Sequence, residues 1–248
     1  MINEKSTGVF LGRTLVQQRG NIGGARSVFV KLQGQKDNLV FPTFGGRVMN
    51  PFKGQAKIFA GDLIEFRTDA DGMKPVIYLL KTYKVKSADS TTVKIYRDGY
   101  KHIPFVGDIL MVAPDDITAK TGNSATVTAV KKDTDGGVDV WTLTMSAAVT
   151  ASDGDILVEA KAEATGTAEM LVKTINAVAP CDYDFVYSDV ADPTDDEEFH
   201  AARYSMTPAL AGTMYKTKMS PVPACVDVFN LSNINGWFTV DGRINRVR

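Results

Sequence analysis

Short runs rich in β-branched and aromatic residues alternate with turn residues between about residue 58 and residue 161. This pattern is typical of β-strands, and no helical period longer than two turns appears there. The predicted strands are Pro75–Lys86, Thr91–Arg97, Ile109–Val112, Ser124–Lys131, Val138–Met145 and Ile156–Ala160. The triplet Asp135-Gly136-Gly137 between the fourth and fifth strands predicts a β-hairpin. The chain is therefore predicted to be mainly β, with a small barrel or sandwich at residues 58–162.

A Gly-Asp pair followed by two apolar residues occurs three times, 46 and 47 residues apart: Gly61-Asp62, Gly107-Asp108 and Gly154-Asp155. Glycine supplies a positive φ at a turn, aspartate can accept hydrogen bonds from the nearby backbone, and the apolar pair can enter a sheet. Apolar residues also surround the second aspartate, which disfavours a ligand site. We therefore expect the three aspartates to cap turns that start strands, and to bind no metal.

The second and third Gly-Asp pairs share a longer context than the first. TTVKIY precedes Gly107 and VWTLTM precedes Gly154, each with a connector of about ten residues, whereas no such strand precedes Gly61. This predicts a degenerate two-unit β pattern inside one module, with the second and third pairs at equivalent corners. A solenoid is not predicted, because it needs three or more regular units.

Residues 1–57 differ from the predicted β module in composition. They are rich in glycine, and they carry nine Lys or Arg residues against Glu4 and Asp37 alone. So much glycine raises the entropy lost on ordering, and the few short apolar runs cannot form an independent core. We predict an extended basic arm that orders against a partner, and we expect deletion of residues 1–50 to leave a folded core.

The last part of the chain, residues 163–248, is predicted to be a mixed, β-rich subdomain. Its predicted elements are a short helix or strand at Met170–Asn176, a strand at Cys181–Tyr187, two short strands within Arg203–Lys218 and a short helix at Cys225–Leu231. An acidic loop spans residues 189–198. This loop lacks the alternating ligands, central glycine and distal glutamate of a helical calcium loop. It is interpreted as a solvated surface or a patch that faces a partner.

The usual signatures of catalysis and of stable cofactor binding are absent from the sequence. His102 and His200 are the only histidines, and neither lies near a nucleophile-like turn. No phosphate-binding loop, dinucleotide fingerprint, zinc-protease motif or nucleophile elbow occurs. Cys181 and Cys225 are expected to be free thiols. No secretion signal and no run of about 18 apolar residues is present. We expect no enzymatic activity, no cofactor and no membrane association.

Two features of the sequence could indicate a ligand: the tyrosines of the predicted strands and the basic residues of the arm. Tyr78, Tyr83, Tyr96 and Tyr100 could line a sugar-binding face, but strand tyrosines more often form cross-strand pairs. The basic arm could contact nucleic acid through phosphates. Aromatic residues are not interleaved with its basic residues, however, and the chain has a net charge of -1 and a pI of about 6.1. Protein contact is therefore favoured over nucleic acid.

Several stretches resemble a known family. The segment from Phe59 through Val112, which contains FAGDLIEF and KPVIYLLKTYKVKSADSTTVKIYRDGYKHIPFVGDILM, is one of them. CDYDFVY and ARYSMTPALAGTMYKTKMSPVPACV are two more. They resemble head fiber or auxiliary capsid proteins of phages and prophages of gut Bacteroidetes. The resemblance implies a non-enzymatic virion component on the outside of the capsid, assembled in the host cytoplasm.

The same resemblance implies the partners: copies of the chain itself, as a trimer or another symmetric homo-oligomer, and the major capsid protein. The candidate partner contacts are the basic residues Arg13, Arg19, Arg26, Lys31 and Arg47 and the acidic residues Asp195, Asp196, Glu197 and Glu198. Three alternatives stay open: a tail or baseplate component, a glycan-binding surface module, and a hydrolase. The hydrolase would need His102 or His200 within hydrogen-bond reach of a carboxylate or thiol.

Overall fold

The computed structural model describes residues 45–50, 57–68, 75–97, 102–184, 205–210, 212–215, 220–226 and 238–241. All regular elements in these residues are strands. The strands of the larger sheets are β1 (Gly46–Val48), β3 (Leu63–Thr68), β4 (Pro75–Leu79), β5 (Thr82–Asp89), β6 (Thr92–Tyr96), β7 (Ile109–Val112), β8 (Ser124–Asp135), β9 (Val138–Met145), β10 (Ile156–Glu159), β11 (Ala177–Val178) and β13 (Ser205–Met206). Shorter pairs are formed by β2 (Lys57–Ile58), β12 (Tyr183–Asp184), β14 (Gly212–Tyr215) and β15 (Phe238–Asp241). The prediction of a mainly β chain is confirmed.

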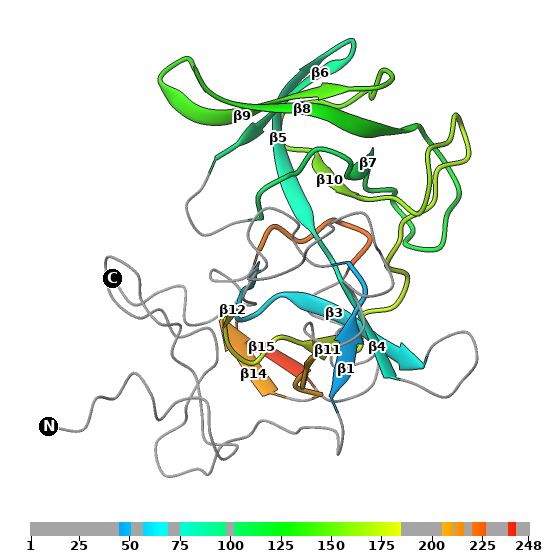
Figure 1. Ribbon diagram of the computed structural model, residues 1–248, viewed down its shortest axis with the longest axis vertical. Helices are drawn as coiled ribbons and strands as arrows, with labels where there is room; N and C mark the ends of the chain where they lie inside the picture. Colours follow the sequence, from blue (N-terminus) through cyan, green and yellow to red (C-terminus); the bar gives the residue numbers. More distant parts are fainter. Residues whose placement is uncertain are drawn as a thin grey trace, which may run out of the picture.

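Six strands form a ring of antiparallel ladders in the order β10-β5-β6-β9-β8-β7, which closes on itself as a barrel. This barrel occupies the upper part of Figure 1. Alternating residues of its strands fill the interior, among them Tyr83, Val85, Leu110 and Leu157. The predicted hairpin is present in it: β8 and β9 pair from Asp135↔Val138 onward. Gly136 and Gly137 supply φ values of 58° and 79°, which a two-residue turn of this kind requires.

The five-stranded sheet has the order β11-β3-β4-β1-β13 and lies below the barrel in Figure 1. The single strand predicted at Pro75–Lys86 is wrong, because this stretch is two strands that belong to different sheets. β4 lies in the five-stranded sheet and β5 in the barrel. Between them the Lys81 backbone N–H donates to the Leu79 carbonyl oxygen at 3.1 Å, which bends the chain. Continuous apolar patterning did not reveal this change of sheet.

The predicted boundary of the N-terminal arm at residue 57 also needs correction. β1 pairs in parallel with β4 and antiparallel with β13, so residues 46–48 are inside the sheet. Gly45 lies so close to β13 that a Cβ atom there would be 2.6 Å from the Met206 carbonyl oxygen. Glycine in this segment therefore permits close packing of two backbones. Deleting residues 1–50 would remove a strand of the sheet, so this deletion is not expected to leave the folded core intact.

Outside these two sheets the ladders are short. β2 pairs antiparallel with β12, and β14 pairs in parallel with β15. Residues 170–176 form neither the helix nor the strand expected, since only Met170 makes a bridge, with Ala160. The predicted strand at Cys181–Tyr187 is represented by β12, and Cys225 lies in a turn. Residues 227–231 of the predicted helix lie outside the described residues. No helix in the described segments is long and apolar enough to span a membrane.

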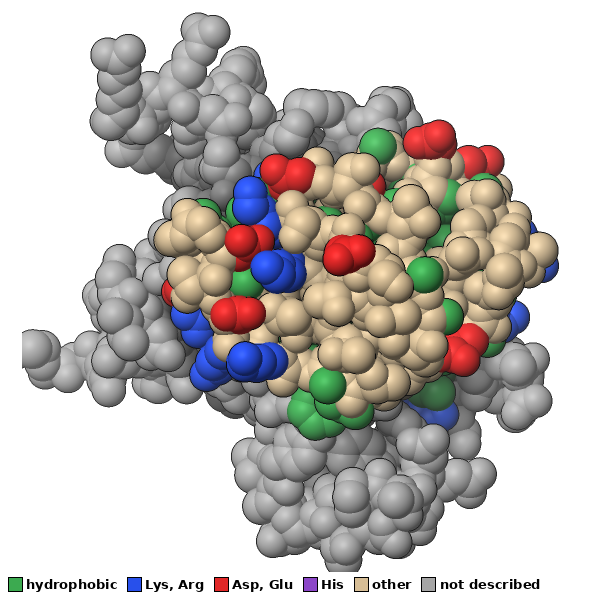
Figure 2. Space-filling view, turned by 90° about the horizontal axis from the view of Figure 1, so that it is seen from above, with side chains coloured by type: hydrophobic (Ala, Val, Ile, Leu, Met, Phe, Trp, Pro, Cys, Tyr) green, Lys and Arg blue, Asp and Glu red, His purple; other side chains and the backbone are tan. Residues whose placement is uncertain are grey.

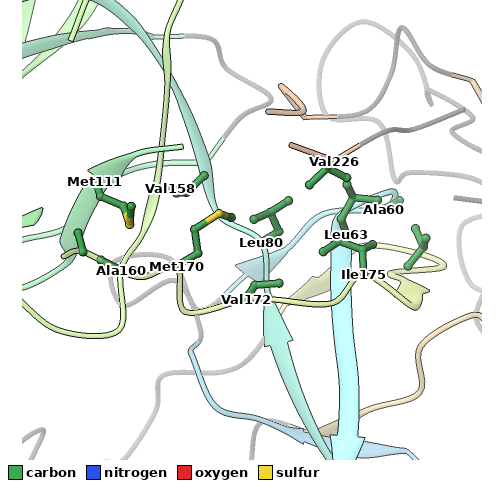
Figure 3. Packing of buried hydrophobic residues seen from close by; sticks show 12 residues of the cluster. Ala60, Leu63, Leu80, Met111, Val158, Ala160, Met170, Val172, Ile175 and Val226 are labelled. Carbon is green, nitrogen blue, oxygen red and sulfur yellow. The ribbon is translucent and has the colours of Figure 1, made fainter. Parts of the chain in front are cut away.

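The barrel and the five-stranded sheet share one hydrophobic core cluster. Figure 3 shows how it runs from Met111, Val158 and Ala160 at the barrel to Leu63 and Ile175 at the sheet. Leu80, at the bend between β4 and β5, lies in the middle with Met170 and Val172. Val226, from the described segment 220–226, packs on the sheet side of the cluster. We call this region, where the two units meet, the junction.

Candidate functional site

The three Gly-Asp pairs form the same turn. Gly61, Gly107 and Gly154 have φ values of 88°, 92° and 95°. Each aspartate accepts, through Oδ2, a hydrogen bond from the backbone N–H three residues earlier, at 2.9, 2.8 and 2.8 Å respectively. The glycine N–H and the aspartate carbonyl oxygen pair with one neighbouring residue, which is Ala179, Val127 or Val85. The first pair therefore shares the geometry of the other two, although the sequence set it apart.

The surroundings of the three aspartates differ more than their turns do. Asp155 is partly exposed, whereas Asp62 and Asp108 are 1% and 3% exposed. The Oδ1 atoms of both buried aspartates point to polar groups at the junction. Sequence reasoning missed these polar groups, because apolar neighbours along the chain do not show which distant side chains meet in space.

His102 is the centre of the first polar cluster at the junction. Its Nε2 lies 2.7 Å from Asp62 Oδ1, and its Nδ1 accepts a hydrogen bond from the Thr82 backbone N–H at 2.9 Å. The hydroxyl of Ser220 donates to the same Asp62 oxygen at 3.1 Å and lies 3.3 Å from His102 Nε2. His102 is buried. A serine, a histidine and an aspartate therefore meet, as in a hydrolase.

The orientation of the His102 ring does not suit acyl transfer. Because Nδ1 accepts a hydrogen bond from the Thr82 backbone N–H, the ring proton lies on Nε2, which donates a hydrogen bond to Asp62. A general base needs a free lone pair directed at the serine hydroxyl, with the aspartate bound to the other ring nitrogen. Here Ser220 and Asp62 share the same ring nitrogen, and Ser220 donates to the carboxylate. The arrangement satisfies buried polar groups and leaves Ser220 without a base.

Lys81 is the centre of the second polar cluster, at the end of the barrel that faces the sheet. Its side chain is 1% exposed, and its ammonium nitrogen lies 3.2 Å from Glu159 Oε2, 3.3 Å from Glu159 Oε1 and 4.0 Å from Asp108 Oδ1. Asn50 Nδ2 donates to Glu159 Oε2 at 2.7 Å. A buried ion pair is held when further hydrogen bonds satisfy its atoms, and the Asn50 carboxamide supplies one of them.

Burial changes the proton affinity of the groups in this second cluster. The pKa of Glu159 is raised, mainly because the carboxylate loses water, although Lys81 and the hydrogen bond from Asn50 oppose this. The pKa of Tyr83 is raised well above its ordinary value by burial, and next by the charges of Asp108 and Glu159. Among the described residues, the buried atoms Thr82 Oγ1, Tyr83 OH and Asp108 Oδ1 accept or donate no hydrogen bond. Such groups are costly, and they usually mark strain or function.

The residues singled out by the sequence for partner or ligand binding are spread over the chain. Arg47 lies in β1, paired with Val76 and Ser205. The other candidate partner contacts, together with Tyr100 and His200, lie outside the described residues. Tyr83 points into the barrel, Tyr78 is in the five-stranded sheet under Arg67, and Tyr96 is in the barrel beside Lys84 and Lys86. The described tyrosines therefore do not line one face.

No metal centre is built by the described part of the chain, where no group of three or more His, Cys, Asp or Glu side chains is placed to hold an ion. Cys181 and Cys225 are both half-buried. Figure 2, which views the barrel end from above, shows acidic and basic side chains interspersed and hydrophobic ones in scattered small groups. This face carries no large patch of one sign. Family models, curated proteins and solved structures were all compared with the chain, and none of them matched.

Proposed function

We propose that this chain is a non-enzymatic structural protein of a bacteriophage particle, bound to the outside of the capsid shell as an auxiliary capsid or head fiber protein. The resemblance described above supports this role. The structural observation that carries the proposal is the position of β1. The basic, glycine-rich residues 1–44 lead directly into β1, which lies between β4 and β13 in the five-stranded sheet.

The position of β1 suits the attachment of an anchoring segment. Because β1 pairs with a strand on each side, a force that acts on the preceding segment is shared between two ladders of backbone hydrogen bonds. A glycine-rich basic segment can wrap a large complementary surface while it orders. Residues 1–44 would contact acidic surface on the shell protein or on copies of the chain, in which Asp195, Asp196, Glu197 and Glu198 supply such charge.

The buried polar clusters support a structural role over catalysis. Both join the two units at the junction, because Asp62 precedes β3 of the sheet while Thr82 and Glu159 belong to barrel strands. In the first cluster the serine has no base. A tail or baseplate component would share all these features, and only its place in the particle separates it from a capsid role.

The deciding experiment compares two kinds of purified particle by electron microscopy. One is assembled with the full chain, which is located in the particle, and the other with a chain that lacks residues 2–44. This truncation keeps β1 and Asn50, so we expect the protein to unfold cooperatively at a melting temperature close to that of the full chain. We also expect the truncated protein to be missing from capsids that incorporate the full chain. Val138→Thr, at an exposed position of the β8–β9 hairpin, is the matched control and is expected to be incorporated normally.

Two results would reject the proposal. Normal incorporation of the folded truncated protein would exclude the anchoring role of residues 1–44. Density for the full chain at the tail or baseplate, and none on the shell, would replace the capsid role with the tail alternative.

A further inference from the structure

Two reactive groups of the second polar cluster, the Lys81 amine and the Asn50 carboxamide, both contact the Glu159 carboxyl at the junction. Glu159 Oε2 is 2.7 Å from Asn50 Nδ2 and 3.2 Å from Lys81 Nζ, so the two nitrogens share one oxygen neighbour. Glu159 Oε1 is 3.3 Å from Lys81 Nζ. Asn50 and Lys81 are 7% and 1% exposed. An amine, an amide and an acid–base group are therefore held together away from solvent.

The Asn50 carboxamide is also fixed in orientation. The backbone N–H of Leu79 donates to Asn50 Oδ1 at 2.7 Å, and Asn50 Nδ2 donates to the Leu79 carbonyl oxygen at 2.9 Å. Only one placement of the amide oxygen and nitrogen satisfies both bonds. The Leu79 N–H is thereby aimed at the oxygen that would become negative if a nucleophile added to the amide carbon. This is how an oxyanion is stabilised in acyl transfer.

We propose that Lys81 and Asn50 become joined by an intramolecular isopeptide bond, with Glu159 as the acid–base group. Glu159 accepts a proton from the Lys81 ammonium, and the neutral Nζ adds to Asn50 Cγ. The negative oxygen of the tetrahedral intermediate is held by the Leu79 N–H. Glu159 then returns its proton to Nδ2, the C–Nδ2 bond breaks, and ammonia leaves. The second proton of Nζ passes to Glu159, which leaves a neutral amide between Lys81 and Asn50 and a protonated Glu159. One amide is exchanged for another, so no oxidant, reductant or co-reactant is needed.

The environment favours these proton transfers. Burial raises the pKa of Glu159, which makes its carboxylate a better proton acceptor for the adjacent ammonium. Transfer converts a buried ion pair into two neutral groups, whose burial costs less. A carboxyl group can accept a proton in one step of a reaction and donate it in a later step. Exclusion of water also protects the tetrahedral intermediate and the product from hydrolysis.

The bond would connect the end of β1 to the bend between β4 and β5. Asn50 lies two residues after the end of β1, and Lys81 lies at the bend between β4 and β5. The cross-link would therefore fasten β1, and with it the chain that precedes β1, to the junction of the two units. Closing the intervening loop also lowers the entropy of the unfolded chain, as a disulfide does. The inference does not depend on a capsid role, since it rests on the described contacts alone.

The test is the intact mass of the purified full chain under denaturing conditions, after incubation of the folded protein at neutral pH. We expect a mass below that of the sequence by one ammonia molecule. Trypsin should fail to cleave after Lys81, and a branched peptide should connect the segment that contains Asn50 with the segment that contains Lys81. A full sequence mass and normal cleavage after Lys81 would overturn the proposal.

Control variants distinguish this bond from other losses of ammonia. Asn235-Gly236 can lose ammonia by forming a succinimide, whereas Asn50 cannot do so through its neighbour because Pro51 has no N–H. Lys81→Met and Glu159→Gln are expected to abolish the branched peptide, and Lys84→Met, at an exposed position of β5, to retain it. In Asn50→Asp the same attack would release water in place of ammonia. A branched peptide that persists in Lys81→Met would overturn the assignment to Lys81, and this result does not require the variant to fold well.

Discussion

His102 Nε2 donates a hydrogen bond to Asp62 Oδ1 across 2.7 Å, and this contact joins the two β units of the molecule. Asp62 immediately precedes the strand β3 of the five-stranded sheet, while the backbone N–H of Thr82 in the barrel strand β5 donates to the opposite ring nitrogen of His102. The Asp62 carboxylate thus caps its own turn with Oδ2 and serves the junction with Oδ1. An aspartate of the Gly-Asp turn is therefore expected to contribute more to stability at the junction than in a partly exposed turn.

Asp62 and Asp155 form a matched pair that tests this difference. Asp155→Ala removes the bond from the Ser152 N–H in a partly exposed turn, so we expect a loss of about 1 kcal/mol, as for other side-chain caps. Asp62→Ala leaves the buried His102 N–H and Ser220 hydroxyl without their acceptor as well, so we expect a loss of about 3 kcal/mol or more. Urea unfolding of both variants measures the two free energies. Equal losses would show that the junction contact contributes nothing.

Ser220 is expected to be chemically inert. The His102 proton lies on the ring nitrogen nearest to Ser220, so no lone pair is available to activate the hydroxyl. A fluorophosphonate probe, which labels activated serines, should therefore not modify the folded chain. Ser220→Ala should lower the free energy of unfolding by about 1 kcal/mol, the typical value of one hydrogen bond. Labelling of the wild-type chain that disappears in Ser220→Ala would restore the hydrolase alternative.

Most of the barrel strands could be predicted from local sequence patterns, because the alternation of a strand and the glycines of a turn act over only a few residues. The alternation in residues 138–145 and the glycines of the Asp135-Gly136-Gly137 triplet act within a few residues of the chain, and both are found in β8 and β9. Lys81 shows where such reasoning ends. It interrupts the apolar run PVIYLLKTY, and a lysine there must either reach solvent or find buried partners. Its partners Glu159 and Asp108 are distant in sequence, so no local pattern identifies them.

The inclusion of residues 45–48 in the sheet can be tested at Gly45. A Cβ atom there would lie 2.6 Å from the Met206 carbonyl oxygen, which is backbone and can move only with β13. We expect Gly45→Ala to lower the free energy of unfolding by about 2 kcal/mol, as overpacking does elsewhere. Gly154→Ala is the control, because its Cβ would meet no atom within 4 Å and only the backbone strain of about 1 kcal/mol remains. Denaturant unfolding measures both. An unchanged free energy of unfolding in Gly45→Ala would indicate that residues 45–48 belong to the arm and not to the sheet.

Glu169 should titrate far below an ordinary glutamate. Hydrogen bonds from the Lys173 ammonium, and next from Lys120 at 2.9 Å, lower the pKa of Glu169 from 4.5 to about 2. A carboxyl whose pKa is lower in the folded state stabilises the fold above the unfolded pKa, and this contribution disappears as pH falls through the folded value. Glu169→Gln should therefore be less stable than wild type at neutral pH and equally stable below about pH 2.

Lysine variants of the same cluster separate the contributions to the Glu169 pKa. Carboxyl carbon NMR shifts followed through an acid titration give that pKa directly. Lys173→Met should raise it most and Lys120→Met next, because these are the two hydrogen-bonding cations. Lys161→Met is the control, since its ammonium lies 4.0 Å away and is well exposed, where ion pairs contribute little. A wild-type pKa near 4.5, unchanged by all three substitutions, would mean that these lysines are solvated and that the cluster does not stabilise the fold.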